Sequence, residues 1–170
     1  IWRETTATGA HLLRALWNNT AADWPTTEFC LWVIVKPVGA RTRYRFSAKG
    51  IDNVWKQVQF DLSGNGSVLV APADVIARIE PEPMFPGWYR LGYGRTQGAS
   101  AGVSPEFDMG PVDANNNNSL PGDVNNGFDL CHIQCEPQLF WTSPIPVTAA
   151  TAKTVRSGDV LKAAGGWQSR

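Results

Sequence analysis

The chain has 170 residues, of which 43% are apolar and 18% charged, a composition typical of a globular domain rather than a disordered segment. Lys and Arg total 15, as do Asp and Glu, which argues against a nucleic-acid binder that depends on phosphate contacts. No apolar run approaches the roughly 20 residues that span a bilayer, so we expect no membrane insertion.

The first elements in chain order are one ambiguous segment and one clear strand. Residues 10–17 are compatible with either a short helix or an apolar strand, because short apolar runs are not resolved by period alone. Residues 29–35 (FCLWVIV) are almost continuously apolar and rich in β-branched and aromatic types, which predicts a strand that ends before Pro37. Further strands are expected over residues 42–48, 54–62, 68–70, 75–79, 88–93 and 128–134.

The spacing of these strands favours an all-β fold. Turn signals rich in Gly, Pro and Asn recur about every ten residues, a pattern typical of an antiparallel β-sandwich or jelly roll. Residues 94–127 are expected to be loop, and the chain from about 144 onward has no strong period and predicts an irregular tail. We therefore expect residues 1–170 to form a single β-sandwich domain, part of a longer chain.

The stretch FPGWYRLGYG at 85–94 predicts a strand entered through a Pro-Gly turn. Alternation places Tyr89, Leu91 and Tyr93 on one apolar face, which we expect to be the core side. Trp88 and Arg90 share the opposite face, where the guanidinium is expected to lie over the indole. A ligand role, if this strand has one, is expected at its far end.

The sequence Cys131-His132-x-x-Cys135 resembles a metal motif only superficially. In a regular strand Cys131, Ile133 and Cys135 fall on one face, which favours buried structural thiols over a zinc site with four ligands. Three Cys is an odd number, which argues against a full disulfide framework and favours synthesis in a reducing cytosol.

The Asn-rich segment presents a second metal question. Asp113, Asn115 and Asn117 alternate as in the first half of an oxygen-ligand calcium loop, so calcium is one interpretation. The twelfth position is Val124 rather than a bidentate Glu, and a polar surface loop is the other interpretation. No other cofactor is expected.

Catalytic constellations are sparse. The two His residues, His11 and His132, lie in no recognisable nucleophile context, and no phosphate-binding glycine loop is present. We therefore expect a protein without enzymatic activity. The eight Trp residues remain as the functional signal, because aromatic faces pack in cores and also stack on sugars.

Several segments resemble, in order, the carbohydrate-binding-module-like jelly-roll domain of bacteriophage tail fibres and tailspikes. The segments are TGAH at 8–11, VQFDLSGNG at 58–66, PGWYRLGYG at 86–94, GDVNNGFDLCHIQCEPQLFWTSPIP at 122–146 and TVRSGDVL at 154–161. The sequence IQCEP departs from the G-A-Q-L-E that ends one strand in that family. Strands that precede TGAH in the family have few residues here to form them.

This resemblance implies a β-sandwich of the concanavalin or carbohydrate-binding-module kind, made in the host cytoplasm and located in the virion tail. It implies host recognition through a bacterial surface polysaccharide, contacts with other tail proteins, and a homotrimer. Two alternatives stay open. The domain could be a structural assembly or decoration element of the virion, or an ancillary sugar-binding module of a polysaccharide-degrading enzyme.

The residues expected to contact a glycan combine aromatic faces with polar partners near predicted loops. They are Trp55, Tyr93, Arg95, Asp123, Asn125 and Trp141.

Overall fold

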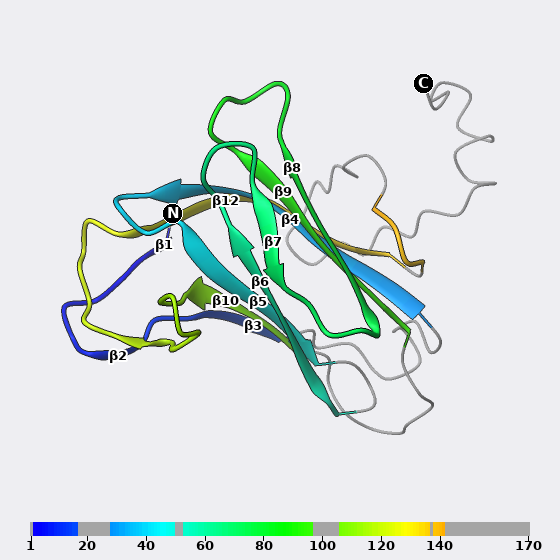
Figure 1. The fold of residues 1–170 in the computed structure, drawn as a ribbon, viewed down its shortest axis with the longest axis horizontal. Coiled ribbons are helices and arrows are strands. Elements are labelled where there is room, and N and C mark those ends of the chain that lie inside the picture. Colours follow the sequence, from blue (N-terminus) through cyan, green and yellow to red (C-terminus); the bar gives the residue numbers. More distant parts are fainter. Residues whose placement is uncertain (1, 17–27, 50–52, 97–105, 137, 142–170) are drawn as a thin grey trace.

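Two five-stranded antiparallel sheets pack face to face (Figure 1). The computed structural model describes residues 2–16, 28–49, 53–96, 106–136 and 138–141, and these ranges contain no helix. The first sheet has the order β1 (Trp2–Arg3), β12 (Gly127–Glu136), β4 (Glu28–Val38), β9 (Tyr89–Thr96) and β8 (Val75–Pro81). The second has the order β3 (Leu13–Leu16), β10 (Glu106–Pro111), β5 (Arg43–Lys49), β6 (Trp55–Asp61) and β7 (Ser67–Val70). A short ribbon pairs β11 (Ser119–Leu120) with β2 (Gly9–Ala10).

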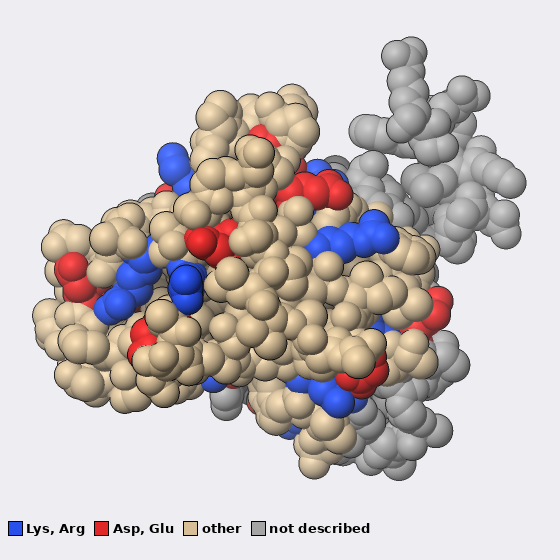
Figure 2. All heavy atoms as spheres, viewed as in Figure 1, with Lys and Arg blue, Asp and Glu red and all other residues tan. Residues whose placement is uncertain are grey.

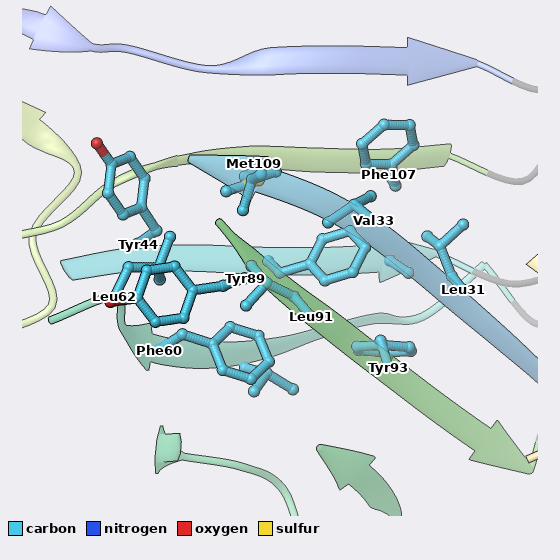
Figure 3. Packing of buried hydrophobic residues seen from close by; sticks show 14 of the residues in the cluster. Leu31, Val33, Tyr44, Phe60, Leu62, Tyr89, Leu91, Tyr93, Phe107 and Met109 are labelled. Atoms are coloured by element: carbon cyan, nitrogen blue, oxygen red, sulfur yellow. The ribbon is translucent and has the colours of Figure 1, made fainter. Parts of the chain in front are cut away.

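The core lies between the two sheets and is made by alternate residues of both. Strand β9 contributes Tyr89, Leu91 and Tyr93, which confirms the expected core face of that strand. Their rings and chains meet the inward residues of the second sheet (Figure 3). The labelled partners include Tyr44, Phe60, Leu62, Phe107 and Met109.

Strand β4 is buried on both faces, which explains why its sequence is continuously apolar. Phe29, Leu31, Val33 and Val35 point into the main core. Cys30, Trp32 and Ile34 point to the outer side of the first sheet, where they form a second apolar cluster with Trp88 and Trp141. A strand with one solvated face would alternate, so the pattern of residues 29–35 already reports two-sided burial.

The outer cluster is covered by residues 138–141, which we call the strap. Its Trp141 ring lies against Gly92 and its Leu139 carbonyl against Gly94, so closely that a Cβ at either glycine would overlap them. The strap therefore occupies space that β9 leaves open by lacking side chains at these two positions.

Trp32 is held by contacts from three directions. Its Nε1 donates to Glu136 Oε1 at 2.7 Å, its ring lies 4.8 Å from the His132 ring, and the Arg90 guanidinium lies 5.2 Å from its centroid. Arg90 therefore covers Trp32, whereas the sequence predicted that it covers Trp88. Gln138 of the strap also donates to Glu136, at 3.0 Å, so one buried carboxylate joins β4, β12 and the strap.

A buried polar network closes the end of the sandwich near β1. The Glu4 carboxylate accepts from both Arg41 Nε and Arg41 Nη2, and also from the Asp123 N–H at 3.1 Å. Asn126 Oδ1 accepts from the Ala40 N–H at 2.8 Å. These bonds join the N-terminal segment, the β4–β5 turn and the loop before β12 without leaving the buried Glu4 unpaired.

The structure confirms the antiparallel sandwich and corrects several finer expectations. Within the ambiguous segment, β3 is a strand, so the helix interpretation is wrong for its described residues. Residues 94–127 contain β10 and β11 rather than loop alone. Jelly-roll connectivity stays a prediction, and the tail expected from about 144 lies outside the described residues.

A register shift in β12 overturns the predicted common face of the cysteines. The pairing with β4 slips between Leu130 and His132, so Cys131 is the extra residue of a bulge and is exposed. Ile133 and Cys135 still pack against the main core. One inserted residue thus changed the face of Cys131, which period-two counting cannot foresee.

We expect Leu91→Ala to lower the free energy of unfolding by about 2–5 kcal/mol, because the side chain is fully buried between the sheets. The matched control is Leu69→Ala on the exposed edge strand β7, where the loss should stay under about 1 kcal/mol. Urea unfolding followed by tryptophan fluorescence measures both. Equal losses would contradict the placement of the core.

Candidate functional site

The outer face of the second sheet carries an open groove of about 330 Å³. Because the inward residues of β5 and β6 fill the core, the alternate residues of the same strands point outward. The groove is lined by Arg45 and Ser47 from β5, Trp55 and Gln57 from β6, and Asp108 from β10. Neighbouring strands in register bring these five side chains together from three separate stretches of sequence.

Opposite charges are paired along the groove. Arg45 Nη2 lies 3.3 Å from Asp108 Oδ2, and Lys49 Nζ forms an ion pair with Glu106. The Lys49 ammonium also lies 5.7 Å from the centroid of the Trp55 ring. On the face of the molecule that Figure 2 presents, Lys and Arg side chains are scattered among Asp and Glu side chains. The groove thus combines hydrogen-bonding groups of both kinds with one aromatic surface.

Trp55 is the exposed aromatic of this groove, with 39% of its surface accessible. It is the first residue of β6, opposite Lys49 at the end of β5. A half-exposed indole beside donors and acceptors offers an apolar face with polar groups at its edge. Of the six residues predicted to contact a glycan, Trp55 is the one that lines the groove.

The Asn-rich loop borders the groove through one contact. Gln57 Nε2 donates to Asn116 Oδ1 at 2.7 Å, so this loop meets the outer face of β6. Asn116 has a positive φ of 66°, a conformation that Asn tolerates better than most residues.

Asp113 holds the loop together as an internal cap. Its Oδ1 accepts from the N–H groups of Asn115 and Asn117, each at 2.8 Å, and its Oδ2 accepts from Asn117 Nδ2 at 2.9 Å. These hydrogen bonds, led by the one from the Asn117 side chain, lower the pKa of Asp113. The Asp113 carboxylate is thus already engaged within its own loop, and the calcium interpretation stays a prediction.

Arg95 is buried, not surface exposed as a ligand contact would require. Only 3% of its surface is accessible, and its Nη1 donates to the Val54 carbonyl at 2.8 Å. Arg95 follows Tyr93 on the inward side of β9, so its side chain reaches under the start of β6. It thus fixes the backbone next to Trp55, and its expected role in direct ligand contact is replaced by a structural one.

Tyr93 lies in the centre of the core. None of its surface is accessible, and its ring packs 5.9 Å from Phe29 and 6.0 Å from Phe46. A ligand at the surface has no access to this ring, so Tyr93 is a packing residue.

The other three predicted residues lie away from the groove. Asp123 caps its own turn, accepting at Oδ1 from both the N–H and Nδ2 of Asn125 at 2.9 Å, in the loop before β12. Trp141 belongs to the strap on the outer side of the first sheet. The six predicted residues thus occupy several separate regions and do not form one site.

Sequence reasoning missed Arg45, Ser47, Gln57 and Asp108. The signal was present in residues 42–48, where polar residues alternate with Tyr44 and Phe46. That pattern predicts a strand with one polar face, but it does not predict which other strands lie next to it in the sheet. The neighbouring strand β10 fell in a stretch expected to be loop, so Asp108 was not placed on a sheet.

All three cysteine thiols have a raised pKa. Burial, followed by the negative charge of Glu136, raises the pKa of the Cys30 thiol to about 12. Burial also raises the pKa of Cys135 and of Cys131. All three thiols in the described ranges are protonated at neutral pH and form no disulfide, and no cluster of three or more potential metal ligands occurs there.

The chain has no recognised relative in two comparisons with known proteins. No protein-family model matches the chain, and no curated protein is significantly similar to it. Across the described residues no helix has the length and apolar character needed to cross a membrane.

We expect Arg95→Met to lower the free energy of unfolding by about 1–3 kcal/mol, since it keeps the apolar stem but removes the donor to Val54. Arg78→Met, at an exposed position of β8, is the matched control and should cost under about 1 kcal/mol. Thermal unfolding followed by circular dichroism compares them. If Arg95→Met is as mild as the control, Arg95 does not have the structural role assigned to it.

Proposed function

We propose that this chain is a non-catalytic glycan-binding domain of a bacteriophage tail fibre or tailspike, and that the groove around Trp55 is its binding site. The observation that carries the proposal is the exposed Trp55 ring among charged and amide side chains on an otherwise polar sheet face. The ordered sequence segments that resemble tail fibre and tailspike domains supply the biological setting.

The chemistry of the groove suits a pyranose ring. The C–H face of a sugar packs on an indole, while its hydroxyls accept from Arg and Gln donors and donate to carboxylates. Arg45, Gln57 and Asp108 offer these partners beside Trp55. Their positions are fixed by β5, β6 and β10, so the binding groups sit on rigid elements.

An open groove of this size gives weak binding for each copy. In the proposed homotrimer on a tail, several copies bind one polysaccharide-coated surface together, and the second contact becomes intramolecular. Weak reversible binding at each site is therefore compatible with firm attachment of the particle. The proposed partners are a bacterial surface polysaccharide and other tail proteins, and the proposed fold connectivity is a jelly roll.

We expect Trp55→Ala to weaken glycan binding about 5- to 150-fold, since stacking on an aromatic ring contributes on the order of 1–3 kcal/mol, as it does for nucleic-acid bases. The control is Val124→Ala, an exposed apolar residue outside the groove, which should bind as the wild type does. A glycan array of bacterial surface polysaccharides, followed by calorimetry on the hits, measures the effect. Unchanged binding by a folded Trp55→Ala protein would rule out the groove as the site.

A second candidate function, assembly with other subunits, is favoured by the tip of the β8–β9 hairpin. Met84 is 78% and Phe85 53% exposed there, and the tip projects beyond the sheets at the top of Figure 1. The turn is rigid: the Glu82 N–H donates to the Trp88 carbonyl at 2.8 Å and the Trp88 N–H to that of Phe85 at 3.0 Å. Exposed apolar residues on a preorganised turn are suited to a protein interface.

If this tip mediates assembly, the double variant Met84→Ser/Phe85→Ser should sediment with a larger monomer fraction than the wild type. The fold should be retained, because neither side chain belongs to the core. Trp55→Ala is the control and should leave the oligomeric state unchanged. Identical sedimentation of the double variant and the wild type would argue against an interface at the tip.

A further inference from the structure

Gln57 lies next to Trp55 on the groove face of β6. The two residues are two positions apart in the strand, so they share one face and are separated by roughly 7 Å along it. In the strand register Gln57 lies opposite Ser47 of β5, which in turn lies opposite Asp108 of β10. All four of these side chains line the groove. A ligand packed on the Trp55 ring therefore has the Gln57 amide at its edge.

The Asn-rich loop orients the Gln57 amide. Gln57 Nε2 donates to Asn116 Oδ1 at 2.7 Å. The amide group is planar, with its nitrogen and its oxygen on opposite sides of the same carbon. A nitrogen held toward the loop therefore turns Oε1 away from the loop, and this oxygen offers an acceptor to a ligand.

The loop that carries Asn116 is closed by hydrogen bonds of its own backbone. The Asp113 N–H donates to the Asn117 carbonyl at 3.0 Å, and the Asn116 N–H donates to the Asp113 carbonyl at 3.1 Å. The Val112 N–H donates to the Arg43 carbonyl at 3.0 Å, which ties the start of the loop to β5. Because β5 lies between β10 and β6, the loop after β10 reaches the groove face of β6 from an anchored base.

We propose, resting on the proposed function, that Asn116 is a positioning residue of the groove and acts through Gln57. It holds the Gln57 amide so that Oε1 accepts from a hydroxyl of a sugar stacked on Trp55. The loop thus presets one hydrogen-bond acceptor beside the aromatic face. What this acceptor requires of the ligand is a free hydroxyl at the edge of the stacked ring.

The backbone at Asn116 allows its side chain to be removed without strain. Its φ of 66° lies in the left-handed region, which glycine adopts readily. Asn116→Gly therefore removes the acceptor for Gln57 Nε2 and keeps the path of the loop. Asn115→Gly is the matched control, because it makes the same substitution one residue away and keeps both the N–H bond to Asp113 and the Asn116 side chain.

The test titrates the full chain with the glycan that the array identifies, and NMR measures the Kd. We expect Asn116→Gly to raise the Kd about three- to tenfold, as for the loss of one neutral hydrogen bond, and Asn115→Gly to change it less than about twofold. An unchanged Kd for Asn116→Gly, with binding still weakened by Trp55→Ala, overturns the inference and leaves the proposed function in place. Absence of binding to every glycan, or full binding by Trp55→Ala, overturns the proposed function and this inference with it.

A double-mutant cycle separates positioning from a general loosening of the loop. Gln57→Ala removes the acceptor itself and should raise the Kd about three- to tenfold. In that background Asn116→Gly should add less than about twofold, because the group that it positions is already absent. The inference is overturned if Asn116→Gly has the same effect with and without Gln57, if Asn115→Gly is as damaging as Asn116→Gly, or if Gln57→Ala binds as the wild type does.

Discussion

The hydrogen bond from the Trp32 indole to the buried Glu136 carboxylate ties together the elements that cover the outer side of the first sheet. The same carboxylate accepts from Gln134 and from Gln138 of the strap, so β4, β12 and the strap are joined at one point. With the strap in place, the outer side of β4 and β9 is covered by Trp88 and Trp141. The groove lies on the other sheet, along the outer face of β5, β6 and β10.

The sequence predicted the architecture well where the signal is local. Alternation assigned Tyr89, Leu91 and Tyr93 to the core, because successive side chains of a strand point to opposite faces of its sheet. The same rule, followed one step further, places Arg95 on the inward side too. The expectation that Tyr93 and Arg95 contact a ligand therefore conflicted with their predicted place on the core face of β9. In the structure both side chains are buried on that core face.

The site was less predictable, because it depends on which strands become neighbours. Trp55 was identified as an aromatic near a turn, but its partners Arg45 and Asp108 come from β5 and β10, some sixty residues apart. Local patterns report whether a strand has a polar face and say nothing about the strand beside it. The bulge at Cys131 shows the same limit within a single strand, since one extra residue moved a thiol from the core side to the surface.

Gly92 and Gly94 have a consequence for how this domain can vary. Both lie in a central strand, where a side chain is ordinarily tolerated or even favoured, yet the strap leaves no room for one. A survey of substitutions would find these two positions as intolerant as a binding site, although they line no part of the groove. Sensitivity to mutation at these two positions therefore reflects the packing of the strap on β9 and is no evidence of a binding site on this side of the molecule.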